Sequence, residues 1–373
     1  MINQKRLIKT FLDLVKIDSE SGNEAAIRKE LTGRLRKLGL KTSVDKVGNL
    51  HAVRPGKAKG PALLFSAHMD TVKPGRGVIP VIKDGKIYSK GQTILGADDK
   101  SGIAEILEML EVLKETKTTS VPIKVLFTVS EEIGLKGSAA ITKQTIKHAE
   151  GATDNTFGFI LDAHGPIGTV ITSAPTHDTF VATVKGKSSH AGIEPDKGIN
   201  AIVAAAKAIA KMTLGRIDEE TTANIGVIEG GMATNIIPAE VIVKGEARSR
   251  NINKLTKQIT HMKDTLDTEC KKLGAKVAFK KTREYKAFNI PANNEVLNIC
   301  ALSAKKTKVK LRLESTCGGS DANHINALGI PAVVLSSGMA KVHSTDEFIK
   351  IADMVKATEF VLNVVLLIKP HNT

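Results

Sequence analysis

Residues 62–72 have the sequence ALLFSAHMDTV, in which a short apolar run ends at a histidine and an aspartate. Such a run is typical of a buried β-strand. Similar runs follow along the chain at KVLFTVS (124–130), FGFIL (157–161) and AVVLSS (332–337). Apolar residues at helical spacing lie between the first two runs, from Ile103 to Leu113. The pattern predicts an α/β fold in which helices cover a sheet.

The pattern changes between about residues 175 and 287. A strand at TFVATVKG (179–186), for which we expect an edge position, is followed by a loop, a helix, two more strands, a long helix and a last strand. This order is typical of a self-contained α+β unit. After residue 288 the chain is again similar to its first part. We therefore expect one domain made of residues 1–174 and 288–373, interrupted by an inserted domain at 175–287.

The composition is that of a globular protein. Of the 373 residues, 42% are hydrophobic and 25% are charged, and no apolar run reaches the roughly eighteen residues that a membrane span requires. The N-terminal residues mix Lys, Arg and Asp into a helical apolar repeat, which is not the pattern of a signal peptide. The three cysteines lie far apart and suggest no disulfide framework. We expect a cytoplasmic protein without a membrane partner.

The net charge of +15 raises the question of a nucleic-acid partner. The lysines are dispersed along the chain, aromatic residues make up 3% and there is no Trp, so platforms for stacking bases are scarce. A solvated, lysine-rich surface is the better interpretation. We expect no nucleic-acid partner.

Side chains that can bind metal follow several of the predicted strands, and open α/β sheets place their ligand sites at these strand ends. Taken singly, each has an ordinary explanation as a core histidine, an acidic turn or a helix N-cap. Their regular recurrence at strand ends favours a metal site instead. With nitrogen and oxygen donors and no cysteine, the set suits catalytic zinc. The candidates are His68, Asp70, Asp98, Asp99, Glu131, Glu132, Asp162 and His343.

These residues belong to an ordered series of motifs that runs through nearly the whole chain. The motifs are SAHMDTV (66–72), GADDKSG (96–102), SEEIGLKGS (130–138), LDAHG (161–165), KSSHAG (187–192), GGMATNIIPAE (230–240) and GGSDANHINALGIP (318–331), followed by His343. The series resembles metallopeptidase family twenty, which contains peptidase T, glutamate carboxypeptidase, and the aminoacylase and desuccinylase branches. GADDKSG and GGSDAN are most similar to the peptidase-T-like branch.

The resemblance implies a zinc-exopeptidase-like catalytic domain, with a central mixed sheet flanked by helices, and an inserted α+β lid or dimerisation domain. It implies two zinc ions, for which cobalt or manganese substitutes in vitro. Asp98 bridges the two ions, His68 and Asp162 complete one ion, and Glu132 and His343 complete the other.

The resemblance also implies roles in catalysis. Glu131 removes a proton from a water that bridges the metals and later returns it to the leaving amine. Asp70 holds the imidazole of His68 in one tautomer. The peptide bond between Asp98 and Asp99 is expected to be cis.

The inserted domain contributes further candidates through the same resemblance. His190 is expected to stabilise the oxyanion in the active site of a partner subunit, which requires a homodimer formed through the inserted domain. Asn235 and Arg248 are expected to bind substrate, with Arg248 on its carboxylate, and Ser320 lies in the expected substrate loop. Peptidase T has an arginine just before this loop, where the present chain has Cys317, so Arg248 or a lysine must bind the carboxylate if the substrate is a tripeptide.

Three functions follow from these considerations. The first is an aminopeptidase- or tripeptidase-like exopeptidase that acts on small peptides. The second is an amidohydrolase that removes an acyl group from an amino acid with the same ligands. The third, a basic binding protein without catalysis, is disfavoured because Glu131 and all five ligand positions are present.

Overall fold

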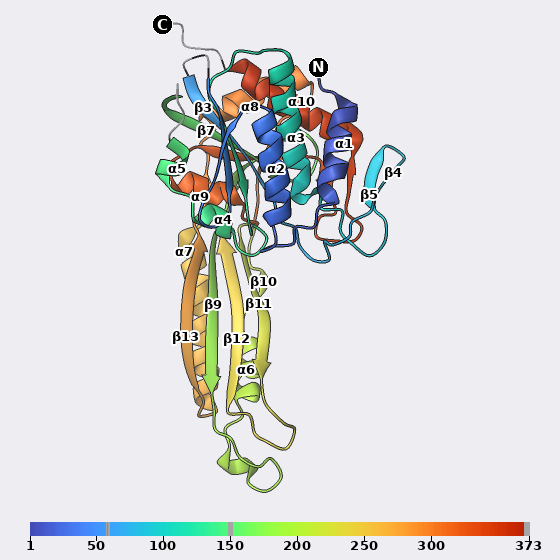
Figure 1. Ribbon diagram of the computed structural model, residues 1–373. Coiled ribbons are helices and arrows are strands. Elements are labelled where there is room, and N and C mark those ends of the chain that lie inside the picture. The colour runs from blue at the N-terminus through green and yellow to red at the C-terminus, as the bar shows by residue number, and fades with distance from the viewer. Residues whose placement is uncertain (57, 59, 148–151, 369–373) are drawn as a thin grey trace. The chain divides into compact units, whose positions relative to one another are not determined.

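The computed structural model describes residues 1–56, 58, 60–147 and 152–368 (Figure 1). The chain divides into two compact units. The first unit comprises Met1–Thr172, Asn289–Ser315 and Ser320–Thr373, and the second comprises Ser173–Phe288 and Thr316–Gly319. The second unit therefore contains a short segment, Thr316–Gly319, that lies outside the insertion expected at 175–287.

The first unit is built on a nine-stranded mixed sheet. Its strands are β1 (Lys41–Val44), β2 (Leu50–Arg54), β3 (Gly60–His68), β6 (Ile123–Thr128), β7 (Ala152–Ala163), β8 (Thr169–Ala174), β14 (Phe288–Asn289), β15 (Arg312–Ser315) and β16 (Ala332–Ser336). Their order is β1-β2-β6-β3-β7-β16-β8-β14, with β15 paired to β8. β3 is parallel to β6 and β7, and β7 is parallel to β16, so the carboxyl ends of these four strands lie at one edge of the sheet. The predicted α/β fold is confirmed.

Helices cover both faces of this sheet (Figure 1). They are α1 (Gln4–Val15), α2 (Ala25–Lys37), α3 (Ala97–Glu115), α4 (Lys136–Ala139), α5 (Lys143–Lys147), α8 (Glu295–Thr307), α9 (Asp321–Ala327) and α10 (Ile351–Leu367). α3 packs so closely on β7 that a Cβ at Gly102 would meet Leu161, whereas a Cβ at Gly158 would meet Ile325 of α9. Gly158 and Leu161 face opposite sides of the strand, so α3 and α9 lie on opposite faces.

A small antiparallel sheet completes the first unit. It consists of β4 (Pro80–Lys83), β5 (Lys86–Ser89), β17 (Met339–Ala340) and β18 (Phe348–Lys350), in the order β17-β18-β5-β4. β18 pairs with β5 through Phe348 and Tyr88, whose rings also contact each other. This pairing holds the C-terminal part of the first unit beside the segment that precedes α3.

The second unit has a five-stranded antiparallel sheet in the order β10-β11-β12-β9-β13. Its elements are β9 (Thr176–Lys185), the 3-10 helix η1 (Pro195–Lys197), α6 (Ala201–Ile209), β10 (Gly215–Arg216), β11 (Thr221–Gly230), β12 (Glu240–Ser249), α7 (Ile252–Lys272) and β13 (Lys276–Tyr285). α6 and α7 pack on one face of the sheet around Phe180 and Val243. Four alanines of α6 are fully buried, since short side chains allow the helix to approach the sheet closely: Ala201, Ala204, Ala205 and Ala208.

The expected edge position of residues 179–186 is wrong. Residues 179–185 belong to β9, which pairs with β12 on one side and with β13 on the other. After α7 the chain forms β13, which pairs with the side of β9 that β12 does not occupy. β9 therefore has no free edge. The outer strands of the sheet are β13 and, beyond β12, β11 with the two-residue β10.

No helix within the described residues is long and apolar enough to cross a membrane.

Candidate metal centre

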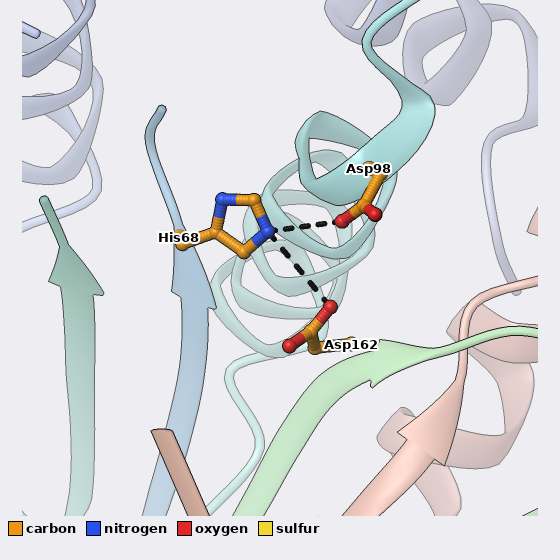
Figure 2. Close-up of side chains that lie close together, drawn as sticks. All are labelled: His68, Asp98 and Asp162. Carbon is orange, nitrogen blue, oxygen red and sulfur yellow. Dashed lines mark hydrogen bonds and ion pairs between the residues drawn. The ribbon is translucent and has the colours of Figure 1, made fainter. Parts of the chain in front are cut away.

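His68, Asp98 and Asp162 form the first ligand group (Figure 2). His68 is the last residue of β3, Asp162 lies near the end of β7, and Asp98 lies at the start of α3. Nε2 of His68 is 2.9 Å from Oδ1 of Asp98 and 3.8 Å from Oδ1 of Asp162. Donor atoms that converge in this way, within 4.8 Å of one another, can hold one metal ion.

Asp98, Glu132 and His343 form the second ligand group. Nε2 of His343 is 3.2 Å from Oδ2 of Asp98 and 3.0 Å from Oε1 of Glu132. Asp98 therefore directs one carboxylate oxygen at each histidine. One carboxylate shared between two ligand groups is the arrangement that a pair of metal ions requires.

The backbone around Asp98 departs from a regular helix. Asp98 has φ −82° and ψ 102°, and Asp99 has φ −122° and ψ 32°, although both lie within α3. The peptide bond between them is cis, as the resemblance of the motifs implies. His343 has a positive φ of 61° in the loop between β17 and β18. Two of the ligand side chains thus come from irregular backbone, whereas His68 and Asp162 come from strands.

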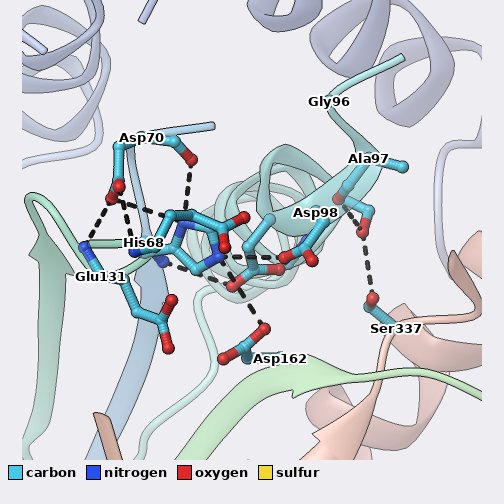
Figure 3. A network of polar contacts seen from close by, with 12 residues as sticks. His68, Asp70, Gly96, Ala97, Asp98, Glu131, Asp162 and Ser337 are labelled. Carbon is cyan, nitrogen blue, oxygen red and sulfur yellow. Dashed lines mark hydrogen bonds and ion pairs between the residues drawn. The ribbon is translucent and has the colours of Figure 1, made fainter. Parts of the chain in front are cut away.

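Asp70 contacts His68 and also the segment that carries the two glutamates (Figure 3). Nδ1 of His68 is 2.8 Å from the main-chain oxygen of Asp70 and 3.5 Å from its carboxylate. The carboxylate accepts hydrogen bonds from the amides of Glu131 at 2.9 Å and Glu132 at 3.2 Å, and from Ser21. The main chain of Asp70 therefore makes the shortest contact to the imidazole, and its side chain holds the turn after β6.

Glu131 lies in neither ligand group, although it is adjacent to Glu132. It is buried, and its burial together with the nearby charge of Asp162 makes its ionised form less favourable. The preceding residue, Ser130, has a positive φ of 53°, and its amide donates to Glu24 at 3.0 Å. Glu131 is thus held close to the ligands with its carboxylate free of them.

The cluster carries more negative charge than its surroundings stabilise. Burial, together with the charge of Asp98, raises the pKa of Asp162 well above its usual value. Burial and the charge of Asp162 raise the pKa of Glu131 in the same way. Buried carboxylates that repel one another are stabilised by a cation placed between them. The donor set of two imidazoles and three carboxylates fits a pair of divalent ions.

The negative charge of the carboxylates also raises the pKa of both histidines. Burial opposes a positive charge on His68, but the carboxylates of Asp70 and Asp98 raise its pKa well above the usual value. Hydrogen bonds to Asp98 and Glu132 raise the pKa of His343 to about 10. A site that favours positive charge on both rings also favours divalent cations, which compete with those protons for the ring nitrogens.

Two candidates from the inserted domain, His190 and Asn235, lie in adjacent exposed loops of the second unit. The amide of Ala191 donates to the main-chain oxygen of Asn235 at 2.9 Å. Nδ1 of His190 accepts from the amides of Gly192 and Ile193, both at 3.2 Å. A neutral ring in this position carries its proton on Nε2, which is then available as a donor.

Arg248 lies on β12 with its guanidinium held by a neighbouring carboxylate. Nε and Nη2 both donate to Glu246 at 3.1 Å. Glu246 also contacts Nε2 of His177 at 2.8 Å, and this hydrogen bond is the main reason that the pKa of Glu246 falls to about 2. Within the described residues, no hydrogen bond to Nη1 of Arg248 is present.

Two further arginines surround Cys317. Nη1 of Arg216 and Nη1 of Arg250 each lie 3.8 Å from its Sγ, and Arg250 also donates to the main-chain oxygen of Thr316. The sequence predicted Arg248 as the arginine that binds the substrate carboxylate, and Arg216 and Arg250 were not identified from it. Ser320, the expected substrate-loop residue, caps the N-terminus of α9 and is buried.

Sequence reasoning also missed several buried carboxylates that support the centre. Glu347 accepts three amide hydrogen bonds from the start of α3, Glu24 holds Ser130, and Asp321 accepts from Thr128 at 2.5 Å. The motif GGSDAN contains Asp321, and Glu347 follows His343 by four residues. Neither position has a periodic signal that distinguishes it from a surface acid.

Comparison with known proteins identifies relatives over almost the entire chain. A sequence profile of peptidase family M20/M25/M40 matches residues 64–367. The uncharacterized protein YqjE of Bacillus subtilis (strain 168) is 40% identical over 373 residues, covering 98% of this chain and 99% of that protein. A crystal structure described as a tripeptidase from Staphylococcus aureus is 40% identical, with a TM-score of 0.91 and 98% of both chains covered. A structure described as aminopeptidase PepT from Bacillus cereus ATCC 10987 is also 40% identical, with a TM-score of 0.86 and the same coverage.

Proposed function

The chain belongs to peptidase family M20/M25/M40, and we propose that it is a cytoplasmic exopeptidase that hydrolyses small peptides at a centre of two zinc ions. The observation that carries the proposal is the shared carboxylate of Asp98, whose two oxygens face the histidines of the two ligand groups. The tripeptidase and the aminopeptidase described for the two structural relatives supply the substrate class.

The five ligand side chains would hold the two ions. His68 and Asp162 complete the first position, Glu132 and His343 complete the second, and Asp98 serves both. Nitrogen and carboxylate donors without thiolate suit zinc in a catalytic site, and cobalt or manganese is an expected substitute in vitro. When bound, the ions would polarise the scissile carbonyl and would lower the pKa of a water molecule at the site.

Glu131 is the proposed general base. Its carboxylate accepts a proton from the attacking water and later transfers it to the nitrogen of the leaving amine. Three observations support this role: Glu131 lies outside both ligand groups, burial raises its pKa, and Asp70 holds its amide at 2.9 Å. A carboxylate with a raised pKa is better suited to accept and then release a proton near neutral pH.

The inserted domain, at about residues 175–287, is proposed to act as lid and dimerisation domain for the catalytic domain at 1–174 and 288–373. Arg248 pairs with the carboxylate of the peptide, and Asn235 and Ser320 contact the substrate. Glu246 orients the guanidinium of Arg248 through Nε and Nη2, and no described residue accepts a hydrogen bond from Nη1, which supports this role. His190 stabilises the oxyanion in the site of a second subunit, and its Nε2 donor supports this role.

The proposal is tested by assaying zinc-loaded protein against dipeptides, tripeptides, N-acetylated peptides and N-acyl amino acids. We expect hydrolysis of peptides that have a free amino terminus, and no hydrolysis of their N-acetylated forms. Preferential hydrolysis of N-acyl amino acids would instead support the amidohydrolase. The matched variant is Glu131→Gln, which should lower kcat by ~10²–10⁴-fold while zinc content stays at two ions per chain. Loss of zinc from this variant would show that Glu131 is a ligand.

A further inference from the structure

Glu347 is a buried carboxylate that none of the proposed catalytic steps uses. The residue is 1% exposed. Oε2 accepts from the amides of Leu95 at 2.8 Å and Gly96 at 2.7 Å, and Oε1 accepts from the amide of Asp98 at 3.0 Å. The three donors lie within four consecutive residues, two just before α3 and one in its first turn, about 250 residues away in sequence. One carboxylate therefore holds the segment that presents the shared ligand.

Within the described residues, the amides of Leu95, Gly96 and Asp98 have no local side-chain acceptor, whereas the amide of Gly102, further into α3, donates to Asp99 at 3.3 Å. Gly96 occupies the N-cap position in the left-handed region, with φ 73°, and it has no side chain to accept the first amides of the helix. Free amides at a helix N-terminus favour a negative charge, and hydrogen bonds to a carboxylate are stronger than those to a neutral acceptor. Glu347 therefore accepts the amides that lie before the part of α3 capped by Asp99.

The orientation of Asp98 depends on this contact. Its φ and ψ of −82° and 102° are not helical, so the hydrogen bonds of α3 do not determine its conformation. Instead, the amide of Asp98 donates directly to Glu347, and this hydrogen bond fixes the backbone at Asp98. A rotation of this backbone would move Oδ1 away from His68 and Oδ2 away from His343, which now lie 2.9 Å and 3.2 Å away.

Glu347 is also joined to the loop that carries the second histidine. Its amide donates to the main-chain oxygen of Ser344 at 3.1 Å, and His343 is the residue before Ser344. The next residue, Phe348, starts β18, which pairs with β5. His343 has a half-exposed side chain, so the loop has more influence on its position than packing does.

We propose that Glu347 is a positioning residue that holds Asp98 and His343 at the correct separation and thereby determines the affinity of the second ligand group for its metal ion. This inference rests on the proposed metal centre. The first ligand group depends on Glu347 less, because His68 and Asp162 lie on strands of the central sheet. The effect of a substitution should therefore fall mainly on one of the two ions.

The test compares metal-free wild-type protein with the Glu347→Gln variant by calorimetric titration with Zn²⁺. An amide has the size of the carboxylate, but its NH₂ group cannot accept a hydrogen bond from a backbone amide. We expect wild-type protein to bind two ions. In the variant, the second ion should bind ~10–100-fold more weakly, as is typical when a group that orients a ligand is removed, and the first should bind within about threefold of wild type.

The matched control is Glu105→Gln on the same helix. Glu105 is fully buried, and among the residues that the structure describes neither of its carboxylate oxygens has a hydrogen-bond partner; burial raises its pKa well above the usual value. An amide should therefore replace it with little effect on either ion. Kinetics add a second readout. At saturating zinc, Glu347→Gln should regain kcat to within a few-fold, since Asp98 and Glu131 remain.

The outcomes are distinct. Equal weakening of both ions, together with a lower melting temperature of the metal-free variant, would mean that Glu347 only supports the fold and would overturn the inference. Unchanged affinity for both ions would also overturn it. Wild-type protein that takes up fewer than two ions would overturn the metal centre and the inference with it. If the glutamine variant does not fold, Glu347→Asp decides the matter, since selective weakening of the second ion supports the role and unchanged binding refutes it.

Discussion

Lys124 is a buried lysine whose replacement should stabilise the protein. It lies on β6, 4% exposed, and within the described residues its ammonium has no hydrogen-bond partner. Its neighbours across the sheet are Leu64 and Val53, which are apolar. Burial lowers the pKa of Lys124 from 10.5 to about 8. A charge without a partner in such a place destabilises the folded state, and methionine would fill the same space without a charge.

The size of the effect follows from the two pKa values. Each pKa unit corresponds to about 1.4 kcal/mol, so the buried charge lowers the free energy of unfolding by about 3 kcal/mol at pH 7. Between pH 8 and pH 10.5 the unfolded chain binds the proton more tightly than the folded one, so the wild-type protein gains stability as the pH rises. The advantage of Lys124→Met should therefore decrease to about 1 kcal/mol at pH 10.

The assay is urea unfolding at pH 7 and at pH 10, followed by far-ultraviolet circular dichroism because the chain has no Trp. The control is Lys29→Met, an exposed position on α2 where both residues are good helix formers. Lys124→Met should be more stable than the control at pH 7, by an amount that falls at pH 10. Equal stability of the two variants at pH 7, or an advantage that does not change with pH, would refute the argument that an unpaired charge is buried at Lys124.

Three further predictions concern the centre and its substrate. Asp98→Ala should lose both ions on dialysis and Asp162→Ala only the first, as measured by metal analysis, because Asp98 belongs to both ligand groups. Arg248→Lys should raise KM by roughly tenfold for peptides with a free carboxylate but not for the corresponding peptide amides, since a lysine cannot form the bidentate pair; equal effects on both would exclude the carboxylate role. Mixing Glu131→Ala with His190→Ala subunits should restore about a quarter of wild-type activity, because half of the exchanged dimers are mixed and each has one intact site. Mixed dimers without activity would exclude the action of His190 in the partner's site.

Much of the fold could be predicted from the sequence because the buried strands are continuous apolar runs with no competing pattern. Each run at 62–67, 124–130, 157–161 and 332–337 corresponds to a strand of the central sheet. The strand ends then predicted where metal ligands would gather, since parallel strands place their carboxyl ends at one edge. The spacing of apolar residues within a strand and the polar residue that follows it are both local features, so they can be read from a single sequence.

Contacts between distant segments could not be predicted in the same way. Glu347 bonds to amides 249 to 252 residues away, and Glu24 bonds to Ser130 across 106 residues. A glutamate that accepts backbone amides has no signature in its own neighbourhood, because its partners are main-chain groups that every residue possesses. The interior position of β9 was missed for a related reason, since strand order depends on where the chain returns after α7.

In two pairs of adjacent acidic residues, the side-chain types alone do not tell which member binds metal, and the geometry does. Asp98 and Asp99 have the same side chain, as do Glu131 and Glu132, so residue type alone assigns neither pair. In the structure, Asp98 faces both histidines, whereas Asp99 accepts from the amides of His68 and Gly102, each at 3.3 Å.

The glutamates divide in the same way: Glu132 lies 3.0 Å from His343, and Glu131 belongs to neither ligand group. Adjacent side chains point in different directions, so Asp98 and Glu132 contact the histidines, whereas Asp99 and Glu131 do not belong to either ligand group. A centre that needs both metal ligands and a proton acceptor can therefore draw them from adjacent residues. Exchanging the two roles would require the backbone at Ser130 or at Asp98 to turn, and hydrogen bonds to Glu24 and to Glu347 hold these two positions.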